Sequence, residues 1–206
     1  MFCMKHTKRY IIAAFVMVFV IGCLFYMWHT NRIFFQGNSV AGLPDGQVRI
    51  WNNPPSHFDL VFNRHGSVNF NHFGTEVSVY IAFYRQDELI MHESVVSIQT
   101  VDYADFSGSA FWGLTTERNS PCELRVSLNT RGVSWNYFDF SLFDFEPRLI
   151  LSPGGGLGSG GRIEYGKQYV MQVWKSGNTF SPDGNMFRPE ILRTSEHTAI
   201  LYIVFR

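Results

Sequence analysis

The sequence predicts an all-β fold: a single β-sandwich of immunoglobulin-like or jelly-roll type, preceded by one N-terminal transmembrane helix. Three observations predict this fold class. Residues 10–28 carry no formal charge and are mostly apolar. From about residue 47, apolar side chains recur at every second position in short segments separated by turn-forming residues, as in half-buried strands. No segment after Trp28 shows the 3.6-residue periodicity of an amphipathic helix.

The first 28 residues have the pattern of a membrane anchor. Residues 1–9 contain three basic residues and no acidic one. A helix over residues 10–28 would be about 28 Å long, close to the hydrocarbon thickness of a bilayer. Tyr10 and Trp28 stand at its ends, where amphipathic rings favour the interface. The positive-inside rule predicts a single pass through the cell membrane, with residues 1–9 as a cytoplasmic tip and the C-terminal domain extracytoplasmic.

A lipoprotein-type signal is an alternative for the same segment, and a cleaved secretory signal is a third. The run Val20-Ile21-Gly22-Cys23 resembles a bacterial lipobox, in which Cys23 would be lipidated. Residues 24–28 remain apolar, whereas a lipoprotein normally continues with a polar tether. An uncleaved anchor is therefore favoured, and all three alternatives place the rest of the chain in the same compartment.

Charge and composition exclude two classes of protein. The 17 basic and 17 acidic residues balance, and without the three basic residues of the tip the exported part is mildly acidic. This balance argues against a nucleic-acid-binding protein with a basic surface. Aromatic residues make up 17% of the chain, which supplies enough apolar surface to exclude general disorder.

The exported part divides into a stalk over residues 29–46 and one domain over residues 47–206. Asn, Gly, Pro and Asp residues interrupt regular structure in the stalk. In residues 76–84 and 122–129, apolar and polar side chains alternate as in half-buried strands. Both faces of residues 198–205 are apolar, which predicts an internal strand, and residues 169–174 are similar. Further strands are expected at 47–51, 58–63, 67–72, 88–98, 109–116, 148–151 and 162–165.

The segment 133–145 is expected to contain a β-bulge. Val133, Trp135 and Tyr137 alternate in one phase, whereas the apolar residues from Phe138 onward continue in the other. A bulge near Tyr137 and Phe138 would produce this change of phase.

Tryptophan and glycine residues are the candidate ligand-binding residues. Trp112, Trp135 and Trp174 lie in or beside predicted strands, and exposed indoles stack on sugar rings; core packing is the alternative role. Gly156 and Gly158 belong to a glycine-rich segment that formally satisfies G-x-G-x-x-G. A strand rather than a phosphate-binding helix is predicted to follow, so no nucleotide is expected and the segment is interpreted as a flexible or partner-binding loop.

Carboxylates are the candidate catalytic groups. Asp102, Asp105, Asp139 and Asp144 lie among aromatic residues, and a glycosidase uses two carboxylates in an aromatic cleft. Their spacing alone brings no two of them together, so no catalytic residue is assigned.

No metal and no cofactor are expected. His57, His65 and His72 lack the close spacing of typical zinc ligands. Cys122 falls on the apolar face of a predicted strand, which favours a buried side chain over a nucleophile.

The sequence therefore predicts a membrane-anchored domain of the bacterial cell envelope that binds or senses an envelope glycan or a protein partner. One alternative is a hydrolase that acts on envelope polysaccharide through paired carboxylates. The other is a structural interaction subunit of a membrane complex. Solvent-facing tryptophans would favour binding, carboxylates converging in a cleft would favour catalysis, and the absence of both would favour the interaction subunit.

Overall fold

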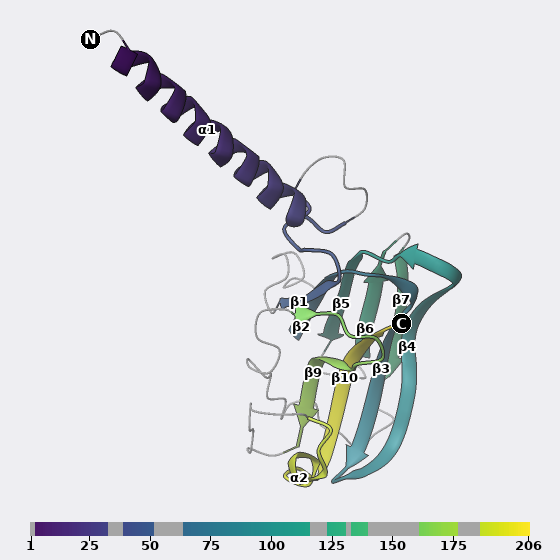
Figure 1. The fold of residues 1–206 in the computed structure, drawn as a ribbon. Coiled ribbons are helices and arrows are strands. Elements are labelled where there is room, and N and C mark those ends of the chain that lie inside the picture. The colour runs from purple at the N-terminus through teal and green to yellow at the C-terminus, as the bar shows by residue number, and fades with distance from the viewer. Residues whose placement is uncertain are drawn as a thin grey trace.

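The computed structural model describes residues 3–32, 39–51, 64–115, 123–130, 133–139, 161–176 and 186–206. In these residues, one long helix, α1 (Cys3–His29), precedes a mostly β domain of two antiparallel sheets. The helix projects from one end of the domain (Figure 1). The β-rich class and the N-terminal apolar helix are confirmed.

Helix α1 is long and apolar enough to cross a membrane over Ile11–His29. Every side chain in this segment is exposed. The apolar helix of a soluble core would bury at least one face against the rest of the fold. The exposure of α1 on all sides is what a helix surrounded by lipid requires.

The first sheet has six strands in the order β7-β6-β5-β2-β1-β8. Their bounds are β1 Gln47–Trp51, β2 Arg64–Asn71, β5 Gly108–Thr115, β6 Glu123–Asn129, β7 Val133–Asp139 and β8 Gly161–Arg162. The strands agree with the expected segments within a few residues, except that the segment expected at 162–165 forms only the two-residue strand β8. The strands expected at 58–63 and 148–151 lie outside the described residues.

The second sheet has four strands in the order β4-β3-β10-β9. Their bounds are β3 Phe73–Arg85, β4 Glu88–Asp105, β9 Tyr169–Lys175 and β10 His197–Phe205. Strand β10 pairs with β3 on one side and with β9 on the other. The internal position expected for residues 198–205 is confirmed, because both apolar faces of this strand are covered.

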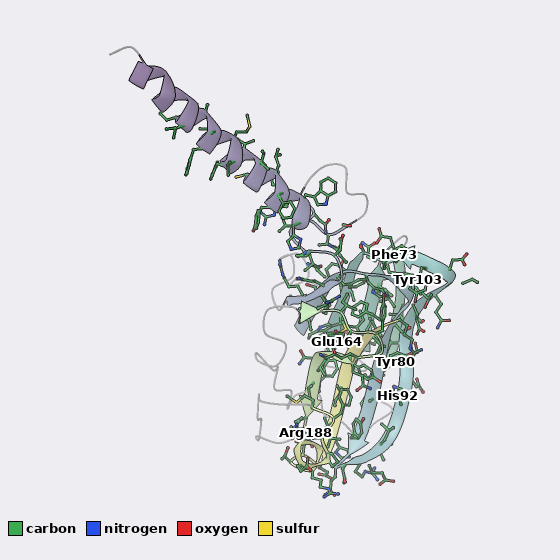
Figure 2. The ribbon with its side chains drawn as sticks, viewed as in Figure 1. Phe73, Tyr80, His92, Tyr103, Glu164 and Arg188 are labelled. Carbon is green, nitrogen blue, oxygen red and sulfur yellow. The ribbon has the colours of Figure 1, made fainter. Side chains whose placement is uncertain are left out.

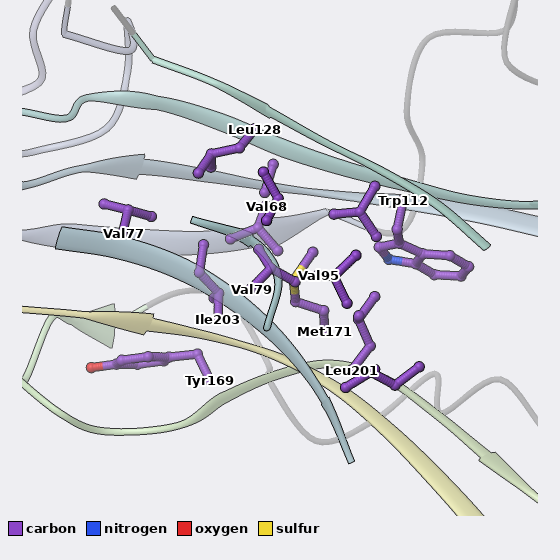
Figure 3. Packing of buried hydrophobic residues seen from close by; sticks show 14 of the residues in the cluster. Val68, Val77, Val79, Val95, Trp112, Leu128, Tyr169, Met171, Leu201 and Ile203 are labelled. Carbon is purple, nitrogen blue, oxygen red and sulfur yellow. The ribbon is translucent and has the colours of Figure 1, made fainter. Parts of the chain in front are cut away.

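The main hydrophobic core draws side chains from both sheets. Figure 3 shows members from the first sheet close to members from the second: Val68, Trp112 and Leu128 from the first, and Val79, Met171, Leu201 and Ile203 from the second. A smaller cluster lies on the outer face of the second sheet, the face away from this core. It packs Ile200 and Val173 against Met186 and Leu192.

Two details of secondary structure differ from the sequence-based expectation. A short helix, α2 (Pro189–Leu192), lies after Trp28 although no helix was predicted there. Its four residues are too few to show helical periodicity, and it is identifiable mainly by the proline at its first turn. The bulge predicted near Tyr137 and Phe138 is also wrong, because β7 pairs with β6 without a register shift from Val133 to Asp139.

Register shifts occur elsewhere, in the pairing of β3 with β4 and of β10 with β9. The largest insertion is in β4. Glu76 pairs with Gln99 and Gly74 pairs with Ala104, so residues 100–103 of β4 face Thr75 alone. An insertion of this kind makes the longer strand bend away from its partner.

Candidate functional site

Helix α1 ends in a Schellman motif at the end of its apolar segment. Asn31 has a positive φ of 53°, a conformation that asparagine tolerates better than most residues. The backbone N–H of Asn31 donates to the carbonyl of Trp28 (3.1 Å), and that of Arg32 donates to the carbonyl of Met27 (2.9 Å). These bonds satisfy carbonyl groups that a helix end otherwise leaves without partners. The helix therefore stops at a defined residue.

Two buried asparagines join this helix end to the domain. The Asn31 side-chain amide donates to the carbonyl of Leu43 (2.7 Å) and to the carboxylate of Asp45 (2.8 Å). The amide of Asn71, the last residue of β2, donates to the same Leu43 carbonyl (2.5 Å), and its oxygen accepts from the N–H of Val40 (2.6 Å). We call these five residues the juncture. Its buried hydrogen bonds hold the described part of residues 29–46 against the domain.

A second group of partnered side chains lies on the outer face of the second sheet. The Nε2 atom of His92 on β4 is 2.6 Å from the phenol oxygen of Tyr202 on β10, and the two ring planes differ by only 5°. The Tyr80 ring on β3 lies against both, with centroids 5.3 Å from His92 and 5.6 Å from Tyr202. Tyr202 is buried and His92 is exposed. We call these three rings the outer-face cluster; it runs from the interior to the surface.

The phenol of Tyr202 stays protonated over the physiological range. Burial raises the pKa of Tyr202, and a hydrogen bond with Gln168 opposes this only in part. The Phe187 ring, from the segment around α2, lies nearly perpendicular to the Tyr202 ring with a centroid distance of 5.3 Å. His92 is therefore the exposed member of the outer-face cluster, and Tyr80 beside it is partly buried; Figure 2 labels both on the second sheet.

The Glu76 carboxylate lies further along the same face of β3. Its Oε1 atom accepts hydrogen bonds from the hydroxyls of Ser78 (2.5 Å) and Tyr80 (3.4 Å), and its Oε2 atom accepts from the guanidinium of Arg206 (3.0 Å). Burial raises the pKa of Glu76, but the hydrogen bonds from Ser78, Arg206 and Gln99 and the guanidinium charge outweigh it and lower the pKa below its usual value. A carboxylate held ionised by so many donors is a poor general base.

Lys175, at the end of β9, is a buried cation under the turn that follows α2. Its ammonium donates to the carbonyl of Ile191 (3.1 Å) and to the hydroxyl of Thr194 (3.4 Å), and burial lowers its pKa. Among the described residues, no carboxylate lies within ion-pair distance of it. A lysine of this kind is nucleophilic only where a substrate can reach it, and Lys175 is fully buried.

His72 is buried and hydrogen-bonded to the backbone. Its Nε2 atom donates to the carbonyl of Arg206 (3.2 Å), because a carbonyl can only accept. Burial lowers the pKa of His72, and the bond to this carbonyl and the charge of Asp105 oppose the shift only in part. No group of three metal-ligating side chains occurs in the described part of the chain. His57 lies outside that part.

Trp112 and Trp174 lie in the core, where they pack edge to face with centroids 5.7 Å apart. Their exposed fractions are 6% and 0%. A buried ring offers no face to a sugar, so these two residues fit the core-packing alternative. Gly66 allows this packing, since a Cβ there would lie 2.6 Å from the Trp112 indole nitrogen.

Several other candidate residues fall wholly or partly outside the described residues. Nothing can be described of Gly156, Gly158, Cys122 and Asp144, or of the side chains of Trp135 and Asp139. Cys23 is exposed on α1.

The two remaining carboxylates, Asp102 and Asp105, have different surroundings. Asp102 is exposed at the bend of β4. Asp105 accepts the backbone N–H of Ser107 (2.8 Å), as a turn-capping aspartate does.

An exposed apolar group lies at the bend of β4, and we call it the apolar tip: Phe73, Val101 and Tyr103. Val101 is 98% exposed, and Phe73 and Tyr103 are each more than half exposed. The two rings lie side by side with their planes 26° apart and centroids 6.0 Å apart, and Figure 2 shows them at the same end of the domain as the attachment of α1. Exposed apolar side chains that gather in one place mark interaction surfaces more often than isolated ones do.

No protein-family model, curated protein or solved structure matches this chain.

The juncture, the outer-face cluster and the apolar tip were not predicted from the sequence. The alternation within residues 76–84 predicted that Ser78, Tyr80, Ala82 and Tyr84 share one face, and this was the one sequence signal for the outer-face cluster. Their partners on β4 and β10 follow only from the strand register.

Proposed function

We propose that the protein is a single-pass membrane protein of the bacterial cell envelope, whose extracytoplasmic β-sandwich binds a partner outside the membrane. Helix α1 carries this proposal. It is long and apolar enough to span a bilayer, and the described side chains of its apolar segment contact nothing in the domain that would bury them. The basic residues before it favour a cytoplasmic N-terminus.

The contacts between the two sheets support the β-sandwich. Side chains of β2, β5 and β6 share one core with side chains of β3, β4, β9 and β10. Two antiparallel sheets that bury their facing sides against each other make a sandwich.

A protein partner is better supported than a glycan. Trp112 and Trp174 are buried and offer no stacking surface. The apolar tip, by contrast, exposes Phe73, Val101 and Tyr103 together. The same observation favours the second candidate function, a structural interaction subunit of a membrane complex, in which the partner is another membrane protein. The described carboxylates give no support to a hydrolase.

Membrane insertion is tested with the full chain carrying a tag at each end, expressed in bacteria. We expect the protein to stay in the membrane pellet after alkaline carbonate, with the C-terminal tag digested by protease added to spheroplasts and the N-terminal tag protected. A Val16→Arg/Val20→Arg variant should be missing from the carbonate-resistant pellet. Each charge at the helix centre raises the free energy of membrane insertion by about 2.5–3.5 kcal/mol. A Val16→Leu/Val20→Leu variant is the matched control. Recovery of the unchanged protein in the soluble fraction would contradict the proposal.

Partner binding is tested with a photo-crosslinking residue at Val101 in intact membranes. We expect one discrete adduct of higher mass, and none from the same probe at Arg125, an exposed position on β6. Equal labelling from both positions, or none from Val101, would contradict a partner at the apolar tip.

A further inference from the structure

Two arginine side chains converge on one glycine beside the end of α1. The Arg32 guanidinium lies against Gly42, such that a Cβ on this glycine would be 3.3 Å from Nη2 and 3.4 Å from Nε of Arg32. The Arg49 guanidinium donates to the Gly42 carbonyl (3.1 Å). Both arginines are exposed. The two cationic groups therefore flank a single glycine residue at the surface.

Neither guanidinium has a carboxylate within ion-pair distance among the described residues, whereas Arg125, Arg193 and Arg206 each have one. Both guanidinium groups carry a positive charge beside the same glycine, and an anion that contacts both would offset their mutual repulsion. Asp45 is the acidic residue of the juncture, and it accepts the amide of Asn31 instead.

The backbone holds this pair of arginines in place. Arg32 closes the Schellman motif of α1 through its own N–H. Gly42 has a φ of +80° and donates its N–H to the carbonyl of Thr30 (2.6 Å), while Arg49 belongs to β1. A site fixed before binding loses less conformational entropy when an anion arrives.

The position of Arg32 and Arg49 relative to the membrane indicates which anion they would bind. The apolar segment of α1 ends at His29, three positions before Arg32. If α1 spans the membrane, as the proposed function requires, the pair lies at the depth of the lipid headgroups. Guanidinium groups bind phosphate oxygens through paired, charge-assisted hydrogen bonds. We propose that Arg32 and Arg49 form a binding site for the phosphate of an anionic lipid headgroup in the outer leaflet.

The site is tested by native mass spectrometry of the full chain in detergent, titrated with phosphatidylglycerol. An arginine near an anionic lipid surface contributes about fivefold to binding, so Arg32→Gln/Arg49→Gln should weaken lipid binding about 25-fold. The matched control is Arg188→Gln, an exposed arginine beside α2 at the opposite end of the domain (Figure 2); it should bind like the unchanged protein. Unchanged binding by the double variant, with an unchanged unfolding midpoint, would overturn the site.

Two further titrations separate the sources of phosphate. Inorganic phosphate at the same concentration should not displace the lipid, and phosphatidylcholine should bind several-fold more weakly. Displacement by inorganic phosphate, or equal binding of the zwitterionic lipid, would overturn an anionic-lipid site. The double variant should still enter the carbonate-resistant pellet, because α1 supplies the anchoring. Failure of the unchanged protein to enter that pellet refutes the proposed function, whereas lipid binding that is insensitive to both arginines refutes this site alone.

Discussion

The two faces of the second sheet are built on different principles. The inner face packs mainly aliphatic and aromatic side chains, such as Ile81, Leu201 and Phe205, into the core shared with the first sheet. The outer face carries the small apolar cluster around Ile200, and beside it groups that each need a particular partner, such as Glu76 with Arg206 and Ser78, or His92 with Tyr202. Burial on the inner face depends on volume and apolar area. For the polar groups of the outer face it depends on hydrogen-bond geometry, because an unsatisfied buried polar group is costly.

The inner face should show the largest loss of stability on truncation. Phe205 is fully buried, and its ring contacts those of Phe70 and Tyr169 at centroid distances of 5.2 and 5.7 Å. We expect Phe205→Ala to lower the free energy of unfolding by about 3–5 kcal/mol, because it removes this burial and leaves a cavity. Guanidinium unfolding of the full chain in detergent, followed by tryptophan fluorescence, measures the loss. Val101→Ala is the exposed control, with an expected change within about 0.5 kcal/mol. A loss below about 1 kcal/mol for Phe205→Ala would contradict the packing of this face.

The carboxylate of the outer face should show an intermediate effect that depends on pH. Glu76→Gln keeps the shape of the side chain but weakens charge-assisted hydrogen bonds, so we expect a loss of about 1–3 kcal/mol at neutral pH. The folded-state pKa of Glu76 is lowered, so its stabilisation is present above the unfolded-state pKa of 4.5 and is lost as the pH falls below it. The difference in unfolding free energy between the two proteins should therefore shrink between pH 7 and pH 3. A difference that is independent of pH would show that the carboxylate charge does not matter here.

The outer-face cluster should show a smaller effect that is specific to one pair of atoms. Tyr202→Phe removes the hydroxyl bonded to His92 and to Gln168 and leaves the ring contacts, so we expect a loss of about 1 kcal/mol, and only the coupling with His92 reports their bond. A double-mutant cycle with His92→Phe should give a coupling energy of about 0.5–1.5 kcal/mol. Additive effects of the two substitutions would mean that the hydrogen bond contributes no stability.

Substitution of Lys175 should have the smallest effect on the free energy of unfolding. It tests whether every polar group on the outer face is needed for stability. Lys175→Met replaces the buried ammonium by an apolar side chain of similar length, so we expect a stability at least equal to that of the unchanged protein. Burial lowers the pKa of Lys175 in the folded state, so the unchanged protein should gain stability as the pH rises towards 10.5. Unfolding at pH 7 and pH 10 should show this gain, and the variant should lack it. A loss of unfolding free energy above about 1 kcal/mol for Lys175→Met would contradict this expectation. It would mean that the two hydrogen bonds of the ammonium stabilise the fold by more than burial of its charge destabilises it.

Periodicity predicted the inner face well and the outer face poorly. Val77, Val79 and Ile81 alternate with polar residues, and this pattern placed them on the buried side of β3. The same pattern assigned Ser78 and Tyr80 to the opposite side without indicating that Ser78 is also buried. Its neighbours on that side come from β4 and β10, and their arrangement depends on the register of three strands.

The alternation of apolar residues also gave a wrong prediction in β7. The alternation changes phase there, but the pairing register with β6 does not change. Apolar residues on both sides of Tyr137 and Phe138 resembled a bulge, yet β7 and β6 pair without interruption. The shifts that do occur, in β3 with β4 and in β9 with β10, leave no comparable mark on the sequence.

Hydropathy along the chain was sufficient for α1, for the β class of the domain and for the internal position of β10, because these depend on neighbours within a few residues. The folded chain decided the rest. Asn31 and Asn71 meet at the Leu43 carbonyl, Arg32 and Arg49 meet at Gly42, and His92 meets Tyr202 from 110 positions away. A hydrogen bond or a charge contact requires two atoms within a few ångströms, and for residues so far apart in the chain only the strand register and the path of the backbone set that distance.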